Sequence, residues 1–268
     1  MSVEIRALQP TRSQLRKFAR FGIDLYEGNP YYVPALIHDD VNTLSPKVNP
    51  AFDFCEAQCF MAYRDGKPVG RIAGIINNAV NGRTGQKTLR FGFVDFIDDT
   101  EVVDALFDAC AAWGKERGMD SMLGPMGFTD MDHEGMLVEG FDQLGTMATI
   151  YNHPYYPRHM ERMGFTPEAE WVEMAIKIPD SIPDKYARVA EIVKTRNNLK
   201  VLKFTSRKKI KEQYGVALFE LINEAYDQLY GYSPLTPRQI DYYIDMYLGI
   251  LNLDFVTVVV DSEDRLVA

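Results

Sequence analysis

The sequence predicts an α+β (mixed α/β) fold that occurs twice, with the second copy incomplete. Residues 60–70 and 255–268 each read as a strand, a polar turn and a returning strand. Before each hairpin the chain repeats Asp-x3-Gly-x5-Pro, from Asp24 to Pro34 and from Asp227 to Pro237. A repeat decides the architecture before any single element does, although two similar hairpins can also arise by chance in an ordinary α+β protein. Because the second copy stops within its hairpin, we expect the sequence to belong to a longer protein.

The elements of the first copy follow from hydrophobic periodicity and turn residues. Alternation predicts a strand at 3–8, and helical spacing predicts a helix capped by Ser13. A long loop with one short helix follows, and the Asp65-Gly66 turn predicts a hairpin, because both residues tolerate positive φ. The strands of this hairpin are expected at 57–63 and 69–76. The later elements are a loop at 77–84, a strand at 88–96, a helix at 100–117 capped by Thr100, strands at 121–123 and 146–151, a helix at 157–163 and a closing strand at 169–178.

The domain division follows the proline-rich segment at 179–183. We expect a first domain at 1–178, a linker and helix at 179–197, and the first half of a second domain at 198–268. The second copy should contain a strand at 200–204 and helices at 210–229 and 238–251.

Composition excludes several classes of function. The net charge of -9 argues against nucleic acid as a partner, and the sequence lacks an apolar run long enough for a membrane span. No apolar signal segment is visible at the N-terminus, so we expect a cytoplasmic protein without a membrane partner.

Three cysteines form neither a disulfide framework nor a zinc pattern, and no metal site is expected. A strand edge at 255–268 makes a homodimer possible.

Three segments resemble the GCN5-related N-acetyltransferase (GNAT) superfamily: the hairpin 57–76, the strand–helix–strand 88–123, and residues 152–165. The last segment is similar to the family's Asn…Tyr-x3-Gly-Phe signature. Residues 124–126 and 152–156 resemble a group of bacterial proteins with two such domains in tandem. The resemblance implies a GNAT-like acyl-CoA acyltransferase fold, acetyl-CoA or another acyl-CoA as cofactor, and a small-molecule amine as acceptor.

The expected cofactor loop departs from the family pattern. GNAT enzymes hold the pyrophosphate with a glycine-rich loop at a helix N-terminus. Here residues 94–103 contain neither glycine nor a basic residue, and Asp98, Asp99 and Glu101 would repel a phosphate, although they also suit a helix start. We therefore expect a degenerate cofactor loop in the first domain and a functional one in the second, beyond Ala268. The resemblance assigns cofactor contacts to Phe96, Ile97, Thr100 and Asn152.

The same resemblance suggests catalytic residues. Asp95 lies on the strand where GNAT enzymes often carry a general base, although alternation alone does not decide which face it occupies. Tyr155 and Tyr156 lie near the position of the family's general-acid tyrosine, but counting back from Gly164 gives Met160.

Two clusters are candidates for substrate binding. The segment Asp130, Asp132, His133 and Glu134 could bind a cation or supply a base, although such segments are more often solvated acidic loops. Tyr151 belongs to a polar-aromatic cluster that suits either a substrate wall or a half-buried helix start.

The sequence leaves three functions open. The first is an acyl-CoA-dependent N-acyltransferase that transfers an acetyl group to an unknown amine. The second is a non-catalytic GNAT-like module that binds a ligand or a protein partner. The third is transfer from a larger donor, such as a long-chain acyl-CoA or an aminoacyl-tRNA, and the net charge of -9 counts against the tRNA.

Overall fold

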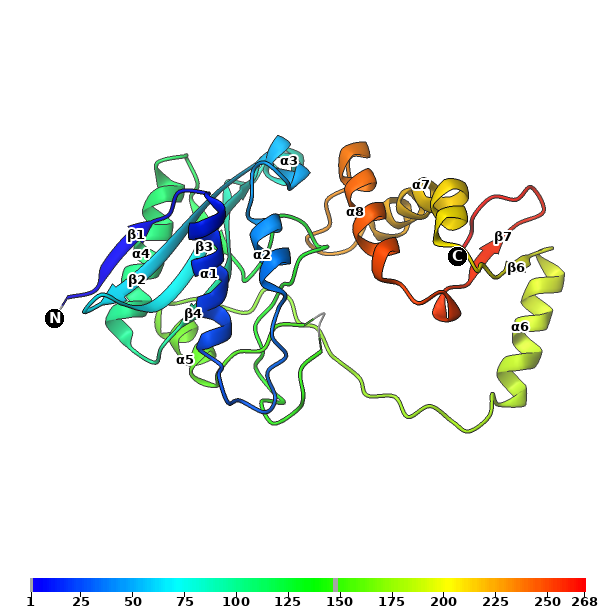
Figure 1. Cartoon of the computed structure of the whole chain (residues 1–268), viewed down its shortest axis with the longest axis horizontal. Coiled ribbons are helices and arrows are strands. Elements are labelled where there is room, and N and C mark those ends of the chain that lie inside the picture. Colours follow the sequence, from blue (N-terminus) through cyan, green and yellow to red (C-terminus); the bar gives the residue numbers. More distant parts are fainter. Residues whose placement is uncertain (1, 147–148) are drawn as a thin grey trace. The chain divides into compact units, whose positions relative to one another are not determined.

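A computed structural model describes residues 2–146 and 149–268, and of residues 248–250 only the backbone. The chain forms two units, residues 1–171 and 172–268 (Figure 1). This division falls seven residues before the expected end of the first domain at residue 178.

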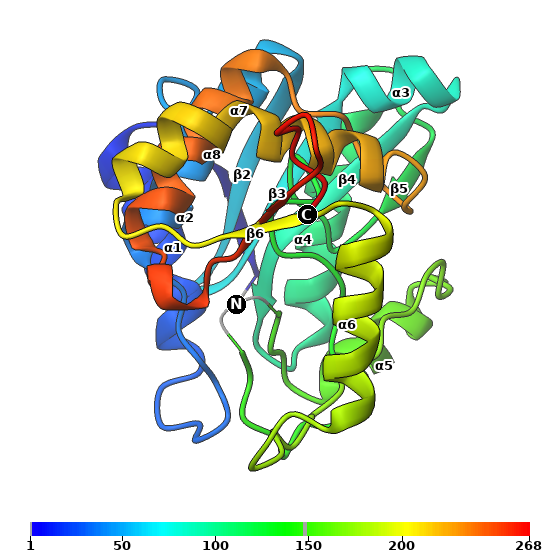
Figure 2. The ribbon, with the colours of Figure 1, turned by 90° about the vertical axis from the view of Figure 1, so that its right-hand side faces the viewer.

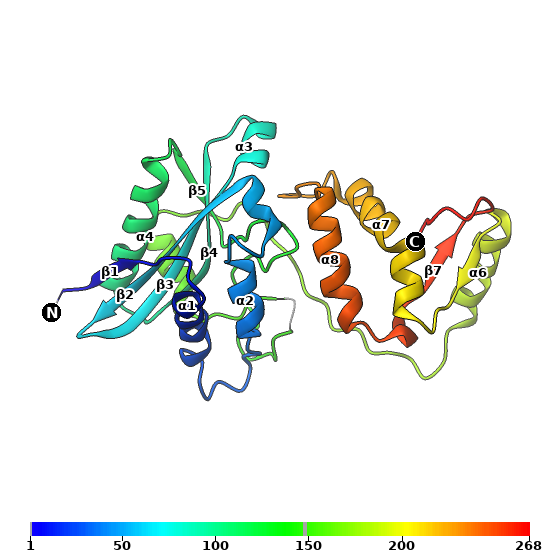
Figure 3. The ribbon, with the colours of Figure 1, turned by 45° about the horizontal axis from the view of Figure 1, so that its top comes forward.

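The first unit is a five-stranded sheet with helices on both faces. Its strands lie in the order β1-β2-β3-β4-β5, and neighbours are antiparallel except for the parallel pair β4 and β5. α1 and α2 pack on one face, and α4 and α5 pack on the other (Figure 3). The elements in order are β1 (Glu4–Ala7), α1 (Arg12–Asp24), α2 (Ile37–Thr43), the 3-10 helix η1 (Pro50–Asp53), β2 (Cys55–Arg64), β3 (Lys67–Asn77), α3 (Asn78–Thr84), β4 (Thr88–Phe96), α4 (Thr100–Lys115), β5 (Ser121–Leu123) and α5 (Tyr155–Arg162).

The mixed α/β architecture and its central hairpin confirm the predicted fold class. β2 and β3 pair around Asp65 and Gly66, whose φ angles are 53° and 75°. Alternation along the strands places Ile72 in the core beneath α4 and α5, and Ala73 in the core beneath α1 and α2.

A β-bulge in β4 sets the orientation of the residues that follow it. Ala73 pairs with Gly92 and Arg71 pairs with Asp95, so that two residues of β4 lie opposite Ile72. Phe93 adopts a φ of 47° at this point. Because the extra residue shifts the pairing by one position, Asp95 lies directly across from Arg71 on the face that carries α1.

The second unit repeats the order of the first half of the first unit. Its elements are α6 (Asp184–Arg196), β6 (Lys200–Leu202), α7 (Arg207–Tyr226), α8 (Pro237–Ile250), the 3-10 helix η2 (Leu253–Phe255) and β7 (Val258–Val260). β6 and β7 are antiparallel, and α7 packs beside α8 (Figures 2 and 3).

The repeat extends to details of the backbone. Gly28 and Gly231 both have positive φ, of 82° and 73°. Asn49 caps η1 and Asn252 caps η2, each by accepting a backbone N–H two residues ahead. Gly231 and Asn252 each lie 203 residues after their counterparts, so the two copies share one spacing through this stretch.

Several element boundaries differ from the expectation. α1 begins at Arg12 with Thr11 as its cap, not Ser13, and residues 78–84 form α3 in place of the expected loop. The strand expected at 146–151 includes residues 147–148, which lie outside the described residues, and residues 149–151 form no strand.

The prediction of a closing strand at 169–178 is wrong, because these residues form no strand. The segment joins no ladder among the described residues, and its apolar side chains are exposed, with Ile176 at 83% and Ile178 at 85%. Alternation predicts which residues share a face, but a strand forms only where a neighbouring strand supplies hydrogen bonds.

No helix in the described ranges combines the length and the apolar character that crossing a membrane would need.

The packing of α1 on β3 depends on Gly22. A Cβ added at Gly22 would lie within contact distance of the Arg71 guanidinium and 2.7 Å from the Asp95 carboxylate. We expect Gly22→Ala to lower the free energy of unfolding by about 3 kcal/mol, because the methyl group would separate this buried ion pair. Urea unfolding followed by tryptophan fluorescence measures the change, since both tryptophans lie in the first unit.

Gly82→Ala in α3 is the matched control for this substitution. No atom lies within 4 Å of the position that its Cβ would take. It should leave the protein unchanged or stabilise it by about 0.5–1 kcal/mol, as alanine does in a helix. Equal unfolding midpoints for both variants would contradict the role of Gly22.

Candidate functional site

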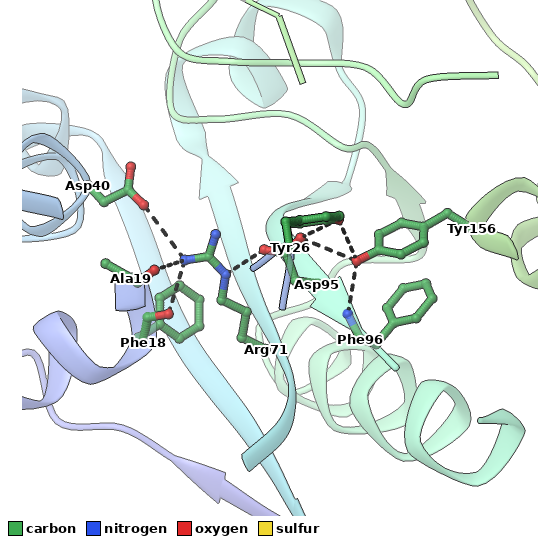
Figure 4. Close-up of polar contacts among 8 residues, drawn as sticks. All are labelled: Phe18, Ala19, Tyr26, Asp40, Arg71, Asp95, Phe96 and Tyr156. Carbon is green, nitrogen blue, oxygen red and sulfur yellow. Dashed lines mark hydrogen bonds and ion pairs between the residues drawn. The ribbon is translucent and has the colours of Figure 1, made fainter. Parts of the chain in front are cut away.

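A buried ion pair between Arg71 and Asp95 forms the centre of the candidate site (Figure 4). Arg71 Nε donates to Asp95 Oδ2 at 2.7 Å, and Nη1 donates to the carbonyl oxygen of Phe18 at 3.0 Å. Nη1 also lies 3.7 Å from Asp40 Oδ2. Burial alone would lower the pKa of Arg71, but Asp95 and Asp40 outweigh it and raise the pKa, so the guanidinium stays charged.

Two tyrosine hydroxyl groups meet the other oxygen of this carboxylate. Tyr26 Oη and Tyr156 Oη lie 3.0 and 3.2 Å from Asp95 Oδ1, and 3.0 Å from each other. Burial, followed by the charge of Asp95, raises the pKa of both phenols well above the usual range. Both hydroxyls therefore keep their protons at neutral pH and act as donors to Asp95.

Both predicted catalytic tyrosines, Tyr155 and Tyr156, form hydrogen bonds with the backbone of Phe96 at the end of β4. The backbone N–H of Phe96 donates to Tyr156 Oη at 3.1 Å, and Tyr155 Oη donates to the carbonyl oxygen of Phe96 at 2.7 Å. The structure thus brings Asp95, Tyr155 and Tyr156 together. Tyr156 is only 1% exposed, so its hydroxyl faces the protein interior and not an open groove.

A row of stacked rings borders this cluster. Tyr32 stacks on Tyr26 with ring centroids 4.4 Å apart, Tyr26 on His153 at 4.7 Å, and His153 on Tyr155 at 5.2 Å. Tyr151 contacts the edge of Tyr26, which places the predicted substrate residue beside the row. The row combines apolar faces with polar tips, as ligand-binding walls do.

Four residues of the site were not predicted from the sequence: Tyr26, Tyr32, Asp40 and Arg71. An arginine within the otherwise apolar strand 69–76 was the available signal, because a buried cation needs a carboxylate partner. The tyrosine-rich loop before residue 50 gave no comparable signal, since tyrosines are equally common in half-buried loops.

The acidic loop at 130–134 contains one carboxylate that stabilises the loop, Asp132, and one with a strongly raised pKa, Glu134. Asp132 is half-buried, and its Oδ2 accepts hydrogen bonds from the backbone N–H groups of Phe128 and Thr129 at 2.8 and 3.2 Å, so it shapes the loop. Burial raises its pKa. Burial and the charge of Asp130 raise the pKa of Glu134 to about 7.

The loop also lies near the Arg71 cluster. His133 is close enough to both Asp40 and Asp132 to lower their pKa values against the larger effect of burial. Across residues 2–146 and 149–268, no group of histidine, cysteine and acidic side chains has the arrangement of a metal site.

The expected cofactor loop already has a ligand for its helix terminus. Asp99, not Thr100, is the N-cap of α4, and its carboxylate accepts the N–H of Val102 at 3.1 Å. Arg64 holds the same carboxylate through two bonds of 2.7 and 3.0 Å, and also binds Glu101. A phosphate at this terminus would have to displace the Asp99 carboxylate.

The four predicted cofactor residues do not form one site. Phe96, Ile97 and Thr100 lie at the end of β4 and the start of α4. Asn152 is buried and bonds the backbone of Leu137 instead. Its Oδ1 accepts a hydrogen bond from the Leu137 N–H at 2.7 Å, and its Nδ2 donates to the Leu137 carbonyl oxygen at 3.0 Å. Asp98, which was expected to repel phosphate, is paired with His159 at 2.8 Å.

The Asp99 cap has a testable dependence on pH. Its bonds to Arg64 lower the pKa of Asp99 from 3.8 to about 2. A lowered pKa stabilises the fold above the unfolded value, and this stabilisation is lost as the pH falls from about 4 towards 2. We expect Asp99→Ala to cost about 1 kcal/mol near neutral pH, with a difference from the unsubstituted protein that shrinks below pH 4.

Urea unfolding at several pH values measures this difference. Asp108→Ala is the control, because Asp108 is an exposed residue of the same helix. A cost for Asp99→Ala that is the same at pH 2.5 and pH 6, or a cost matched by Asp108→Ala, would rule out the cap as its origin.

Comparison with known proteins gives distant relatives. No family model matches the chain. The chain is 28% identical over 229 residues to Protein YghO of Escherichia coli (strain K12), covering 85% of this chain and 57% of that protein. It is 27% identical over 231 residues to Bacterial ceramide synthase of Caulobacter vibrioides, covering 85% of this chain and 59% of that protein. The chain thus spans less than two thirds of either relative.

Among solved structures, the chain is similar to a tandem GNAT protein from the clavulanic acid biosynthesis pathway. The TM-score is 0.52 at 13% sequence identity, over 99% of this chain and 72% of that one. Together with the observed sheet order and the central hairpin, this similarity shows that the chain has the GNAT fold.

Proposed function

We propose that this chain forms part of an acyl-CoA-dependent N-acyltransferase whose first unit binds the amine acceptor. The GNAT fold supports acyl transfer from a CoA thioester, although a fold alone does not fix a reaction. One relative is named a ceramide synthase, and a ceramide is the amide of a fatty acid with a long-chain amino alcohol. That relative supports an amine acceptor, and it favours a long-chain acyl group over acetyl.

The observation that carries the proposal is the excess of carboxylates around the aromatic row. Arg71 serves two carboxylates, Asp40 and Asp95, and so compensates only one of their charges. The neighbouring loop adds Asp130, Asp132 and Glu134, with Arg90 as the cation beside them. An excess of negative charge attracts an ammonium group, and the row of rings offers apolar faces to the rest of the acceptor.

The reaction requires that the bound ammonium group first loses a proton. The free amine then attacks the thioester carbonyl carbon, the C–N bond forms, the C–S bond breaks, and CoA leaves as the thiol. We assign the proton acceptor to Glu134, because its neighbour His133 lies close to Asp40 of the Arg71 cluster and because a carboxyl whose pKa is raised to about 7 is partly ionised at neutral pH. Asp95 is a poorer acceptor because both of its oxygens already receive hydrogen bonds.

The acyl-CoA phosphates are proposed to bind the second copy of the fold. In the first unit the N-terminus of α4 is occupied by Asp99, and the N–H of Phe96 is occupied by Tyr156. The same two contacts favour the second candidate function, a non-catalytic module in which the first unit binds an amine or a protein partner without transferring an acyl group.

Calorimetry with acetyl-CoA and with a long-chain acyl-CoA separates these functions. We expect no binding by the 268-residue chain, and binding by a form extended to the length of the relatives. Binding to the 268-residue chain that Asp99→Ala strengthens would place the phosphates at the N-terminus of α4 and contradict their assignment to the second copy. No binding by either length would support the non-catalytic module.

Glu134→Gln tests the proton acceptor. In the form that binds acyl-CoA, we expect a fall in kcat of roughly 100-fold, the lower range for loss of a general base. The rate with the unsubstituted protein should rise as the pH passes about 7, because ionised Glu134 is the active form, and this rise should vanish in the variant. CoA thiol release with a long-chain amino alcohol as acceptor measures both.

The control for this substitution is Glu139→Gln, an exposed residue of the same loop. It should change neither kcat nor the pH profile. A Glu134→Gln variant that keeps the rise near pH 7 would transfer the role to another group.

A further inference from the structure

A groove with a volume of about 820 Å³ lies along α1, between this helix and the β2–β3 hairpin. This volume lies within the range of roughly 300–1,000 Å³ that small-molecule sites occupy. One wall is a stripe of α1 from Ser13 to Asp24, and the opposite side comes from the β2–β3 hairpin and the residue after β4. None of the lining residues belongs to the Arg71 cluster, so the groove is separate from the site described above.

The α1 wall of the groove is basic. Arg16, Lys17 and Arg20 all line it and are exposed. Arg20 is paired with Asp24 at 2.6 Å. Arg16 and Lys17 have no ion-pair partner in the part of the chain that the structure describes. In a chain of net charge -9, two uncompensated cations on one wall mark a place for an anion.

The floor of the groove is apolar. Leu25, Ile37 and Ile97 are half-buried there, and Pro68 is exposed at the hairpin. These residues come from four separate elements or their ends, so only the folded unit brings them together. Water contact with such a strip is unfavourable, and an alkyl chain laid on it would remove apolar surface from water.

The dimensions favour a linear ligand. The stripe from Ser13 to Asp24 spans about 16 Å at the helical rise of 1.5 Å per residue. A long slot with one basic wall and an apolar floor matches a molecule with one anionic end and one extended hydrocarbon chain.

We infer that this groove binds a long-chain fatty acid, with its carboxylate at Arg16 and Lys17 and its chain along the apolar floor. The inference does not depend on the proposed acyl transfer, because it concerns binding in the absence of CoA. The groove can therefore hold a fatty acid whether or not the first unit acts on an amine.

Calorimetric titration of the 268-residue chain with dodecanoate, below the concentration at which it forms micelles, tests the inference. We expect binding at one site, with an affinity that rises roughly two- to fourfold per methylene from octanoate to dodecanoate as more of the chain is covered. Dodecylamine, which has the same chain and the opposite charge, and pyrophosphate, which has no chain, should bind at least about tenfold more weakly. Equal binding of dodecylamine or pyrophosphate overturns the inference.

Charge reversal locates the carboxylate. Arg16→Glu with Lys17→Glu should weaken dodecanoate binding by about tenfold or more, because both ionic contacts are lost. Lys47→Glu with Lys87→Glu makes the same change in net charge at exposed residues that do not line the groove, and should leave binding unchanged. Equal losses in both double variants would show a general charge effect and overturn the assignment.

A spin label locates the chain independently of any substitution. A nitroxide near the methyl end of the fatty acid should broaden the NMR signals of the Leu25, Ile37 and Ile97 methyl groups. Broadening confined to other methyl groups overturns the inference. So does binding to vesicles of equal parts phosphatidylglycerol and phosphatidylcholine without binding of free dodecanoate, because the basic stripe would then serve a membrane surface.

Discussion

The buried guanidinium of Arg71 connects four elements that are distant in sequence. It lies on β3, pairs with Asp95 on β4, donates to the last turns of α1 through the carbonyl oxygen of Phe18, and approaches Asp40 on α2. Removing a charge from water costs several kcal/mol unless partners replace the lost hydration. The fold around the site is therefore constrained by the need to supply all of these partners at once.

Three local features serve that constraint. The bulge at Phe93 moves Asp95 into register with Arg71. Gly22 leaves α1 without a side chain where the guanidinium passes. Since Arg71 occupies one oxygen of Asp95, only the other oxygen is left for the tyrosines, which explains why Tyr26 and Tyr156 converge on a single atom.

Local patterns were sufficient to predict most elements of the first unit, whereas the site depends on contacts that they do not encode. The hairpin was predictable because Asp65 and Gly66 are residue types that tolerate the positive φ angles of its turn. The sheet face on which Asp95 lies was not predictable. One extra residue in β4 changes the alternation, and nothing in the sequence around Phe93 indicates this bulge. Asp99 rather than Thr100 caps α4 because Arg64, distant in sequence, holds the carboxylate in place. Alternation at 169–178 was real, but no pairing strand accompanies it in the described residues.

Three oxygen atoms lie within hydrogen-bonding distance of one another: Tyr26 Oη, Tyr156 Oη and Asp95 Oδ1. Only two protons are available for these three contacts. Each phenol carries one proton, so at most two of the three close contacts are hydrogen bonds at any moment. Rotation of either hydroxyl exchanges one bonding pattern for another while all heavy atoms stay fixed. The cluster can thus reorient its dipoles in response to a change in nearby charge without any repacking of the core.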